Sequence, residues 1–282
     1  MTGPEGFVAR MALFAFVAAF FFSASPAAAD EVLLVGGTGT GIGTMRLLKV
    51  AFERRHPDIT IRMLPSLGSS GAIRALAKGA LDIGVISRTF TSEELRLGLQ
   101  KLDFARTPFV FVANKAVPES NLSGSRVEEI LSGRIATWPS GDRIRLILRP
   151  AADSDTKAVR ETSPGIRAAI DNLLGRKGML VALTNQECLE LVEKTPGSLG
   201  FTSLAQVVSE ERNIKILSFN GVRPSLSTLD KGAYPLSQTL SIITRGPAST
   251  ARKSFIDFVA SPEGERIIQQ AGSIPLKGKP RG

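Results

Sequence analysis

Three short segments of this chain place Thr or Ser hydroxyls between a predicted strand and a predicted helix. They are residues 38–43 (TGTGIG), 68–71 (GSSG) and 154–156 (SDT), the last without glycine. The first backbone N–H groups of a helix lack internal partners, and together with the helix dipole they attract anions. Each segment alone is better explained as a capped helix start after a tight turn. Three of them in one basic chain favour the binding of an anion.

The glycine run 36–43 does not match the nucleotide-binding templates. A dinucleotide fingerprint that begins at Gly37 would need glycine where Ile42 stands. A Walker loop that begins at Gly36 reaches Gly41 in register, but Ile42 then occupies the place of the lysine. We therefore expect this segment to hold a small oxyanion, through backbone N–H groups and hydroxyls, and not a nucleotide.

Two arginines directly follow predicted strands, at the end of the strand where α/β sheets bind ligands. Arg88 follows the strand 81–86, and Arg149 follows the strand 143–148. A guanidinium in such a place can bind an oxyanion through two parallel hydrogen bonds, although a solvated surface charge is the alternative for either. Other basic side chains lie on predicted helix faces and are expected to face solvent: Arg46, Arg74 and Lys78.

Residue types for catalysis or metal binding are scarce. The one histidine, His56, stands beside a proline in a predicted surface turn, and the one cysteine, Cys188, lies among apolar positions of a predicted amphipathic helix. A phosphate-ester hydrolase would need a nucleophile with a base or a metal, and multi-cysteine sites are excluded. Asp153 and Asp155 suit helix capping better than acid–base catalysis. We therefore expect no enzyme activity, no metal and no cofactor.

The composition indicates a globular protein with an anionic partner. The chain has 282 residues, is 43% hydrophobic and 22% charged, and carries a formal net charge of +9. This length gives one or two domains with a packed core and excludes a disordered, collagen-like or coiled-coil protein. Positive charge favours anions. Nucleic acid is not expected, because a single Trp and a single Tyr leave little for base stacking.

The first residues are typical of a secretory signal peptide. Arg10 precedes the uninterrupted apolar run 11–22, and the small residues 27–29 stand before Asp30. The apolar run is shorter than the ~20 residues that span a membrane, and a retained N-terminal anchor is the alternative. We expect cleavage after Ala29 and export of the product, without a lipid anchor, because no cysteine lies near the cleavage site.

The remaining chain alternates short apolar strands with amphipathic helices. It begins with strand 31–35, helix 44–55, strand 59–64, helix 72–78 and strand 81–86, which predicts a parallel sheet. Because no linker-like tract is present, the chain is expected to cross between two α/β lobes more than once. Later strands are predicted at 109–113, 143–148, 200–202, 214–217 and 240–244, and helices at 127–131, from 157 on, 166–174, 186–193, 251–260 and 263–271.

Two stretches, 68–73 (GSSGAI) and 79–88 (GALDIGVISR), resemble a known family most strongly. On these residues the chain resembles the phosphate-binding proteins of bacterial high-affinity ABC uptake systems, which are type II periplasmic binding proteins. The resemblance extends over nearly the whole predicted mature chain. Its C-terminal part supports the fold, and the segments around 68–71 and 149–156 support the ligand. Further matching stretches are 130–138, 149–156, 195–201, 234–236, 258–264 and 274–276.

The resemblance implies two α/β lobes that close like a hinge on an anion held in the cleft between them. Two crossover strands, near 109–113 and 237–244, would join the lobes. Lobe 1 would then consist of residues 30–112 and 237–282, and lobe 2 of residues 113–236, after the signal peptide 1–29.

The resemblance also implies which residues hold the ligand. In the family these are the first glycine-rich loop, the serine of the GSSG loop, a residue after the third strand, and an arginine with a Ser-Gly-Thr turn. Carried over to this chain, they are Thr38, Gly39, Thr40, Gly41, Ile42, Ser69, Ser70, Gly71, Ser87, Arg88, Arg149, Ser154, Asp155 and Thr156.

The chain departs from the family pattern at two places. Arg88 stands where the best-known members have an aspartate that accepts a proton from the ligand and so prefers phosphate to sulfate; other members also have Ser-Arg there. The usual Ser-Gly-Thr is replaced by Ser154-Asp155-Thr156, with one extra residue after Arg149. Since an unpaired carboxylate repels phosphate unless the two share a proton, we hypothesise that Asp155 accepts that proton and that Arg88 adds a positive contact.

The expected function is that of a periplasmic solute-binding protein that captures inorganic phosphate and delivers it to an inner-membrane ABC permease. A monomer is expected from the family. One alternative is another tetrahedral oxyanion, such as sulfate, molybdate or a phosphonate. Another is a sensory or adhesion protein on the same fold, which a neighbouring sensor kinase or adhesin gene would favour, whereas neighbouring permease and ATPase genes would favour transport.

Overall fold

The computed structural model describes residues 31–277, so the predicted signal peptide lies outside it. The N-terminal elements are β1 (Glu31–Gly37), α1 (Gly39–Glu53), β2 (Ile59–Met63), α2 (Gly68–Ala77), β3 (Ile83–Ile86), α3 (Ser92–Leu95) and β4 (Gln100–Ala113). The middle elements are β5 (Asn121–Leu122), α4 (Gly124–Ser132), β6 (Arg145–Leu148), α5 (Ser154–Arg160), α6 (Pro164–Leu174), β7 (Leu180–Val181), α7 (Asn185–Lys194), β8 (Ser198–Ser203), α8 (Leu204–Ser209), β9 (Lys215–Ile216), β10 (Ser218–Phe219) and α9 (Leu226–Asp230). The C-terminal elements are β11 (Ser237–Thr244), α10 (Thr250–Val259), α11 (Pro262–Gln270) and β12 (Ile274–Pro275).

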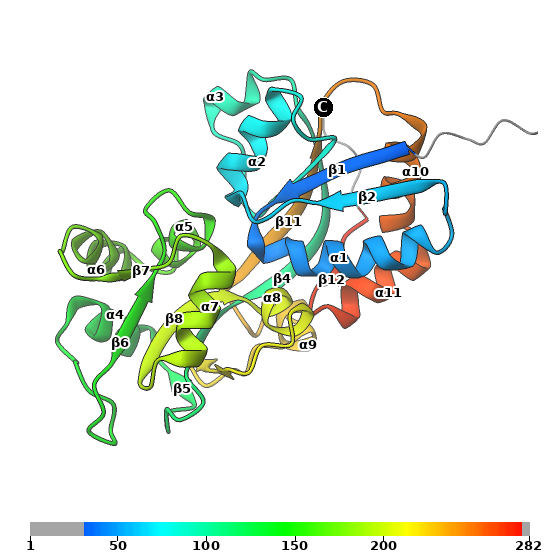
Figure 1. Cartoon of the computed structure of the whole chain (residues 1–282). Helices are drawn as coiled ribbons and strands as arrows, with labels where there is room; N and C mark the ends of the chain where they lie inside the picture. The colour runs from blue at the N-terminus through cyan, green and yellow to red at the C-terminus, as the bar shows by residue number, and fades with distance from the viewer. Residues whose placement is uncertain (1–30, 278–282) are drawn as a thin grey trace, which may run out of the picture.

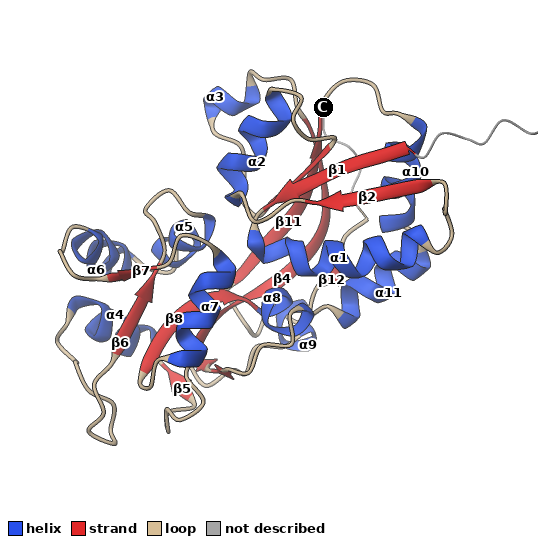
Figure 2. Cartoon of the chain, in the orientation of Figure 1, coloured by secondary structure: helices blue, strands red, loops and turns tan. Residues whose placement is uncertain are grey.

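One sheet runs through both lobes, in the strand order β2-β1-β3-β11-β4-β8-β6-β7 (Figure 1). In the first lobe β1 pairs in parallel with β2 and β3, and β11 is antiparallel to both β3 and β4. The second half of β4, residues 109–113, leaves β11 and pairs with β8, and β6 is parallel to β8 and β7. Helices cover the faces of both halves (Figure 2). The predicted α/β class and the two-lobed arrangement are therefore confirmed.

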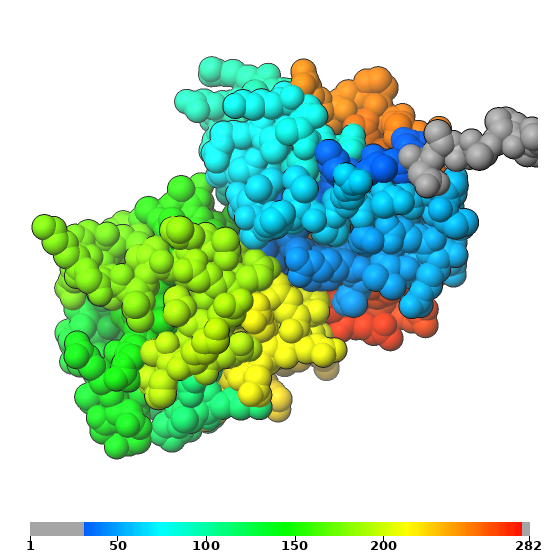
Figure 3. Space-filling view, in the orientation of Figure 1, coloured from blue at the N-terminus to red at the C-terminus, as the bar shows by residue number. Residues whose placement is uncertain are grey.

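Each lobe has its own hydrophobic core, and β4 contributes to both. Phe104 packs with Phe52 and Phe255 in the first core, whereas Phe109 packs with the buried Trp138 in the second. Burying such side chains contributes ~1.5–3 kcal/mol each relative to exposure. The lobes meet along a continuous face, where the blue and cyan part of the chain touches the green and yellow part (Figure 3). Because β4 is part of both cores, it fixes the position of the region where the two lobes meet.

The structure differs from the sequence prediction at two glycine-rich segments. Both were expected as loops, but α1 begins at Gly39 and α2 begins at Gly68. At the first segment the physical reason is close packing: a Cβ on Gly37 would lie 2.1 Å from the Val85 carbonyl oxygen, and one on Gly39 would lie 2.5 Å from the Asn185 Cβ. Gly37 and Gly39 therefore let strands and lobes approach each other. At the second segment a Cβ on Gly68 would meet no other described atom within 4 Å, and Gly68 instead supplies the left-handed backbone, φ 64°, with which α2 begins.

Most other predicted elements are found within a few residues of their expected bounds. The strand expected at 109–113 is the second half of the longer β4, and the crossover expected at 237–244 is β11. Short elements such as β5, β7, β10 and β12 were not predicted. Within residues 31–277, no helix combines the length and the apolar character that crossing a membrane requires.

Candidate functional site

Nine buried or nearly buried polar side chains meet where the two lobes touch, and we call them the interlobe cluster. Those from the first lobe follow β1, begin α2, follow β3 or lie on the crossover strand β11. Those from the second lobe follow β6, begin α5 or begin α7. Each is at most 6% exposed. The members are Thr38, Thr40, Ser69, Ser87 and Gln238 on one side, and Arg149, Ser154, Asp155 and Asn185 on the other.

Hydroxyl groups connect the two sides of the interlobe cluster directly. The Oγ atoms of Ser69 and Ser154 are 2.7 Å apart, which joins the start of α2 to the start of α5. The Ser87 backbone N–H donates to Ser69 Oγ at 3.1 Å, and the Thr38 and Ser87 hydroxyl oxygens lie 3.4 Å apart. Hydroxyls can donate or accept, so this group can turn its hydrogens toward an anion's oxygens.

The Asp155 carboxylate lies at the centre of the interlobe cluster. Its Oδ1 accepts from Gln238 Nε2 at 2.9 Å and from Thr40 Oγ1 at 3.4 Å, and its Oδ2 accepts from Asn185 Nδ2 at 2.7 Å. Burial, and secondarily the negative charge of Asp153, raises the pKa of Asp155 to about 7. The capping role expected for Asp155 is wrong, because Asp153 is the N-cap of α5 and accepts from the Asp155 N–H.

Arg149 is held rigidly beside the cluster. Its Nη1 donates to the Ala182 carbonyl at 2.7 Å, and its Nη2 donates to Asp153 Oδ2 at 2.7 Å and to Asn185 Oδ1 at 3.4 Å. The side chain is 2% exposed, and its Nε has no hydrogen-bond partner among the described residues. Thr156 is also buried, but its hydroxyl donates to the Arg149 carbonyl and so stabilises this segment.

Arg88 lies at the edge of the site and not within the cluster. Its two Nη atoms donate to the two carboxylate oxygens of Glu94, each at 2.7 Å, and Nη2 also donates to Ser70 Oγ at 2.9 Å. The hydrogen bond from Arg88 is the main reason that the pKa of Glu94 falls to about 2. The positive contact that we expected from Arg88 is therefore offset by a carboxylate.

The remaining predicted site residues lie on the first turns of α1 and α2. Neither helix has a side-chain cap, since the N-cap residues Thr38 and Leu67 accept no bond from it. These helix starts thus suit the predicted anion binding by backbone N–H groups. Ile42 is fully buried and offers only its backbone. The predicted residues in these turns are Gly39, Gly41, Ile42, Ser70 and Gly71.

Sequence reasoning missed two members of the cluster, Asn185 and Gln238. Gln238 could have been found, because it is a polar amide on a strand already predicted to cross between the lobes, and the structure buries it. Asn185 begins α7 just after the N-cap Thr184, and nothing in its local sequence separates it from an ordinary helix start.

Other residues weighed for chemistry lie elsewhere. Cys188 is buried in a hydrophobic core, and burial raises the pKa of its thiol to about 12. His56 stacks on Phe52 with ring centroids 4.3 Å apart. Arg46, Arg74 and Lys78 are exposed, as expected. Among residues 31–277, no group of three or more His, Cys, Asp or Glu side chains could hold a metal ion.

Comparison with known proteins places the chain among binding proteins. A family model described as a PBP superfamily domain matches residues 23–263. The phosphate-binding protein PstS of Borreliella burgdorferi is 23% identical over 255 residues, which cover 88% of this chain and 91% of that protein. The protein of the same name from Bacillus subtilis is 25% identical over 251 residues, covering 85% of this chain and 80% of that protein.

A solved structure shows the same fold. It is a candidate phosphate ABC transporter substrate-binding protein from Clostridium perfringens with bound phosphate. The two chains superpose with a TM-score of 0.72 at 22% sequence identity, over 88% of this chain and 100% of that one.

Proposed function

Because the chain belongs to the PBP superfamily, we propose that it is a solute-binding protein that captures inorganic phosphate and delivers it to an ABC transporter. The relatives above carry phosphate-binding names, and a structure with the same fold holds phosphate. The observation that carries the proposal is the interlobe cluster: buried hydroxyls from both lobes lie beside a buried arginine and a carboxylate with a raised pKa. Such a site binds and does no covalent chemistry, so the protein is not an enzyme.

Binding replaces the water around the anion with donors from both lobes. Phosphate enters between Ser69 and Ser154, whose direct contact it exchanges for two hydroxyl–phosphate hydrogen bonds. Hydrogen bonds to a charged group contribute ~1.5–3 kcal/mol each, so several together offset the free-energy cost of closing the cleft. In this proposal the lobes are residues 30–112 with 237–282 and residues 113–236, of which residues 30 and 278–282 lie outside the part that the structure describes, and closure and binding are one event.

Asp155 makes the site prefer an anion that carries a proton. Its carboxylate accepts bonds from Gln238 and Asn185 and, when ionised, has no hydrogen to donate, so it can bond to an anion only where the anion supplies the proton. A phosphate that retains a proton can share it with Asp155, whereas fully ionised sulfate meets a like charge. Arg149 holds the segment, and its Nε–H, which has no partner among residues 31–277, can donate to the anion.

The proposal places the protein in the periplasm as a monomer, exported by the signal peptide 1–29 and docking on an inner-membrane permease. Inorganic phosphate is the ligand, and neither a cofactor, a metal nor nucleic acid takes part. Sulfate, molybdate or a phosphonate in place of phosphate, or a sensory or adhesion role on the same fold, are the alternatives to transport of phosphate.

Isothermal titration of protein freed from ligand by unfolding and refolding tests this function. Phosphate and sulfate are each titrated at pH 5.5 and at pH 8. We expect micromolar or tighter phosphate binding and no sulfate binding at pH 8. Equal binding of both anions at pH 8 would show a general oxyanion site, and no heat with either would contradict the proposed ligand.

A further inference from the structure

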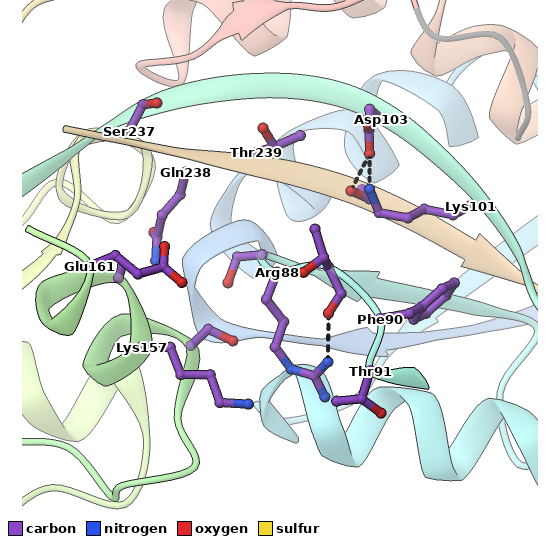
Figure 4. A pocket seen from close by; sticks show the side chains of 15 residues that line it. Arg88, Phe90, Thr91, Lys101, Asp103, Lys157, Glu161, Ser237, Gln238 and Thr239 are labelled. Carbon is purple, nitrogen blue, oxygen red and sulfur yellow. Dashed lines mark hydrogen bonds and ion pairs between the residues drawn. The ribbon is translucent and has the colours of Figure 1, made fainter. Parts of the chain in front are cut away.

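A cavity of about 430 Å³ opens beside the interlobe cluster (Figure 4). It shares Ser87, Ser154 and Gln238 with the cluster and extends between β11, α5 and the segment after β3. Pockets that bind organic small molecules occupy about 300–1,000 Å³. Inorganic phosphate held at the shared hydroxyls would leave most of this space unused, so the cavity has room for a substituent on the phosphate.

One wall of the cavity contains a buried acceptor that lacks a donor. Gln238 is 5% exposed, and its Nε2 donates a hydrogen bond to Asp155 Oδ1. Its Oε1 has no hydrogen-bond partner among the described residues. Leaving such a buried acceptor unpaired is unfavourable, and a hydroxyl on a ligand would pair with it.

The charges in the cavity balance one another. Arg88 is paired with Glu94, and Lys101 is paired with Asp103. Lys157 is half-buried and Glu161 is exposed. Among the described residues 31–277, neither side chain makes a hydrogen bond or an ion pair.

In Figure 4 the Lys157 side chain extends from α5 toward Arg88, and Gln238 lies on the neighbouring strand β11. A donor group on α5 and an acceptor on β11 that line the same cavity, with no net charge left over, suit a neutral substituent that both donates and accepts hydrogen bonds. Hydroxyl groups do both.

We propose that this site also binds phosphate monoesters of small polyols, with the phosphoryl group at the shared hydroxyls and the polyol in the cavity. Gln238 Oε1 accepts from one ligand hydroxyl, and Lys157 donates to another. This inference rests on the proposed phosphate site and extends it from inorganic phosphate to a class of organic phosphates.

Titration calorimetry with three probes tests it: inorganic phosphate, glycerol 3-phosphate, and ethyl phosphate, which has the phosphoryl charge but no hydroxyl. We expect glycerol 3-phosphate to bind at least tenfold more tightly than ethyl phosphate. Binding of inorganic phosphate without glycerol 3-phosphate, or equal affinity for the two esters, would overturn the inference and leave the proposed function standing. Binding of none of the three would overturn both.

Two variants localise the ester in the cavity. Ser237 is exposed at its mouth, so Ser237→Trp fills the space without disturbing a core, and we expect it to abolish ester binding and keep phosphate binding. Lys157→Met should weaken glycerol 3-phosphate about tenfold more than it weakens inorganic phosphate. The matched control is Lys177→Met, which removes an exposed charge from the same lobe away from the cavity. Unchanged ester binding in Ser237→Trp would place the ester elsewhere and overturn the inference.

Discussion

We expect Asp155 to set the pH dependence of ligand choice. Its pKa of about 7 lies between the two titration conditions, so the carboxyl is neutral at pH 5.5 and ionised at pH 8. The ionised form repels sulfate but can share a proton with phosphate. We expect the ratio of phosphate to sulfate affinity, measured by calorimetry, to be at least tenfold larger at pH 8 than at pH 5.5.

Asp155→Asn should remove that pH dependence, because the amide does not ionise. The matched control is Asp142→Asn, which neutralises an exposed carboxylate in the same lobe and should behave like wild type. If Asp155→Asn keeps the preference for phosphate at pH 8, another group accepts the ligand's proton.

The same carboxyl also affects the stability of the ligand-free fold. Its pKa is raised from 3.8 to about 7 on folding, so the folded state binds more protons than the unfolded state between these values. The free energy of unfolding therefore falls as pH rises through this window and levels off above pH 7. From pH 5.5 to pH 8 this group should cost the wild type about 2 kcal/mol.

Urea unfolding at the two pH values measures this effect as a difference between wild type and Asp155→Asn. The other titrating groups are common to both proteins, so subtraction isolates Asp155. Equal pH dependence of the free energy of unfolding in both proteins would show that Asp155 titrates normally.

Arg149 and Asp153 form a buried ion pair, and removing one partner should destabilise the fold more than removing both. Their side chains are 2% and 9% exposed, and removal of one partner leaves the other charge without compensation. Arg149→Met should lower the free energy of unfolding by about 3–5 kcal/mol. The double variant Arg149→Met/Asp153→Asn should recover part of that loss, and additive single effects in denaturant unfolding would contradict a coupled pair.

At this scale the sequence identified the hydroxyls and Arg149 but not their partners. Ser69 and Ser154 were predicted site residues because they lie where predicted helices begin, and Ser87 because the family resemblance marks its segment. Asn185 joins the cluster through contacts with Asp155 and Thr40, which are 30 and 145 positions away, and no local pattern encodes such approaches. Glu94 was not foreseen as the partner that neutralises Arg88, for the same reason: ion pairing is decided by the folded backbone.

Among the elements, the pairing of β1 with β3 depends on a glycine that sequence reasoning assigned to a loop. A Cβ on Gly37 would lie 2.1 Å from the Val85 carbonyl oxygen, so Gly37→Ala must push the two strands apart. We expect a loss of several kcal/mol in the free energy of unfolding and weaker phosphate binding, since Thr38 follows directly.

Gly124→Ala is the matched control for this change. Gly124 lies at the start of α4, where an added Cβ would meet only the ring edge of Phe219, at 3.7 Å. This variant should change stability by less than about 1 kcal/mol. A similar, small effect of both substitutions on thermal unfolding would show that β1 and β3 tolerate the displacement.

The long elements could be predicted from periodicity, and their starts could not. The spacing of Met45, Leu48 and Phe52 predicted the body of α1, but its first turn consists of glycines and threonines that favour a loop. Packing makes this turn helical, because these small residues are buried between β3 and the second lobe. Two-residue strands such as β7 carry too few side chains to show alternation.

For the whole molecule, the shared strand β4 predicts a single unfolding transition. Trp138, the only tryptophan of the chain, is buried in the second core, where its Nε1–H donates to the Gly197 carbonyl at 2.9 Å. Its fluorescence therefore reports the second lobe, and far-ultraviolet circular dichroism reports both. We expect the two signals to coincide during urea unfolding, because β4 cannot leave one core without disturbing the other.

A circular dichroism transition with two steps, of which only one follows Trp138, would show that the lobes unfold independently. Phosphate should move both signals together to higher urea, since a ligand held by both lobes stabilises the folded state as a unit.

The two-lobed plan itself was predictable because βαβ order and the absence of a linker indicate repeated crossing. The direct contact between the lobes was not, because bonds such as Ser69–Ser154 depend on how far a hinge has turned. The spacing of residues along the chain does not predict the angle between the lobes.

The position of β11 in the sheet has a consequence for the order in which the chain can fold during synthesis. β11 lies between β3 and β4 but comes from residues 237–244, more than a hundred residues after β4 begins. Until that segment emerges from the ribosome, the facing edges of β3 and β4 have unsatisfied backbone groups, and the first core lacks α10 and α11. The first lobe therefore cannot complete its sheet or its core until β11, α10 and α11 have been synthesised. That delay exposes β3 and β4 to aggregation in any chain that terminates early.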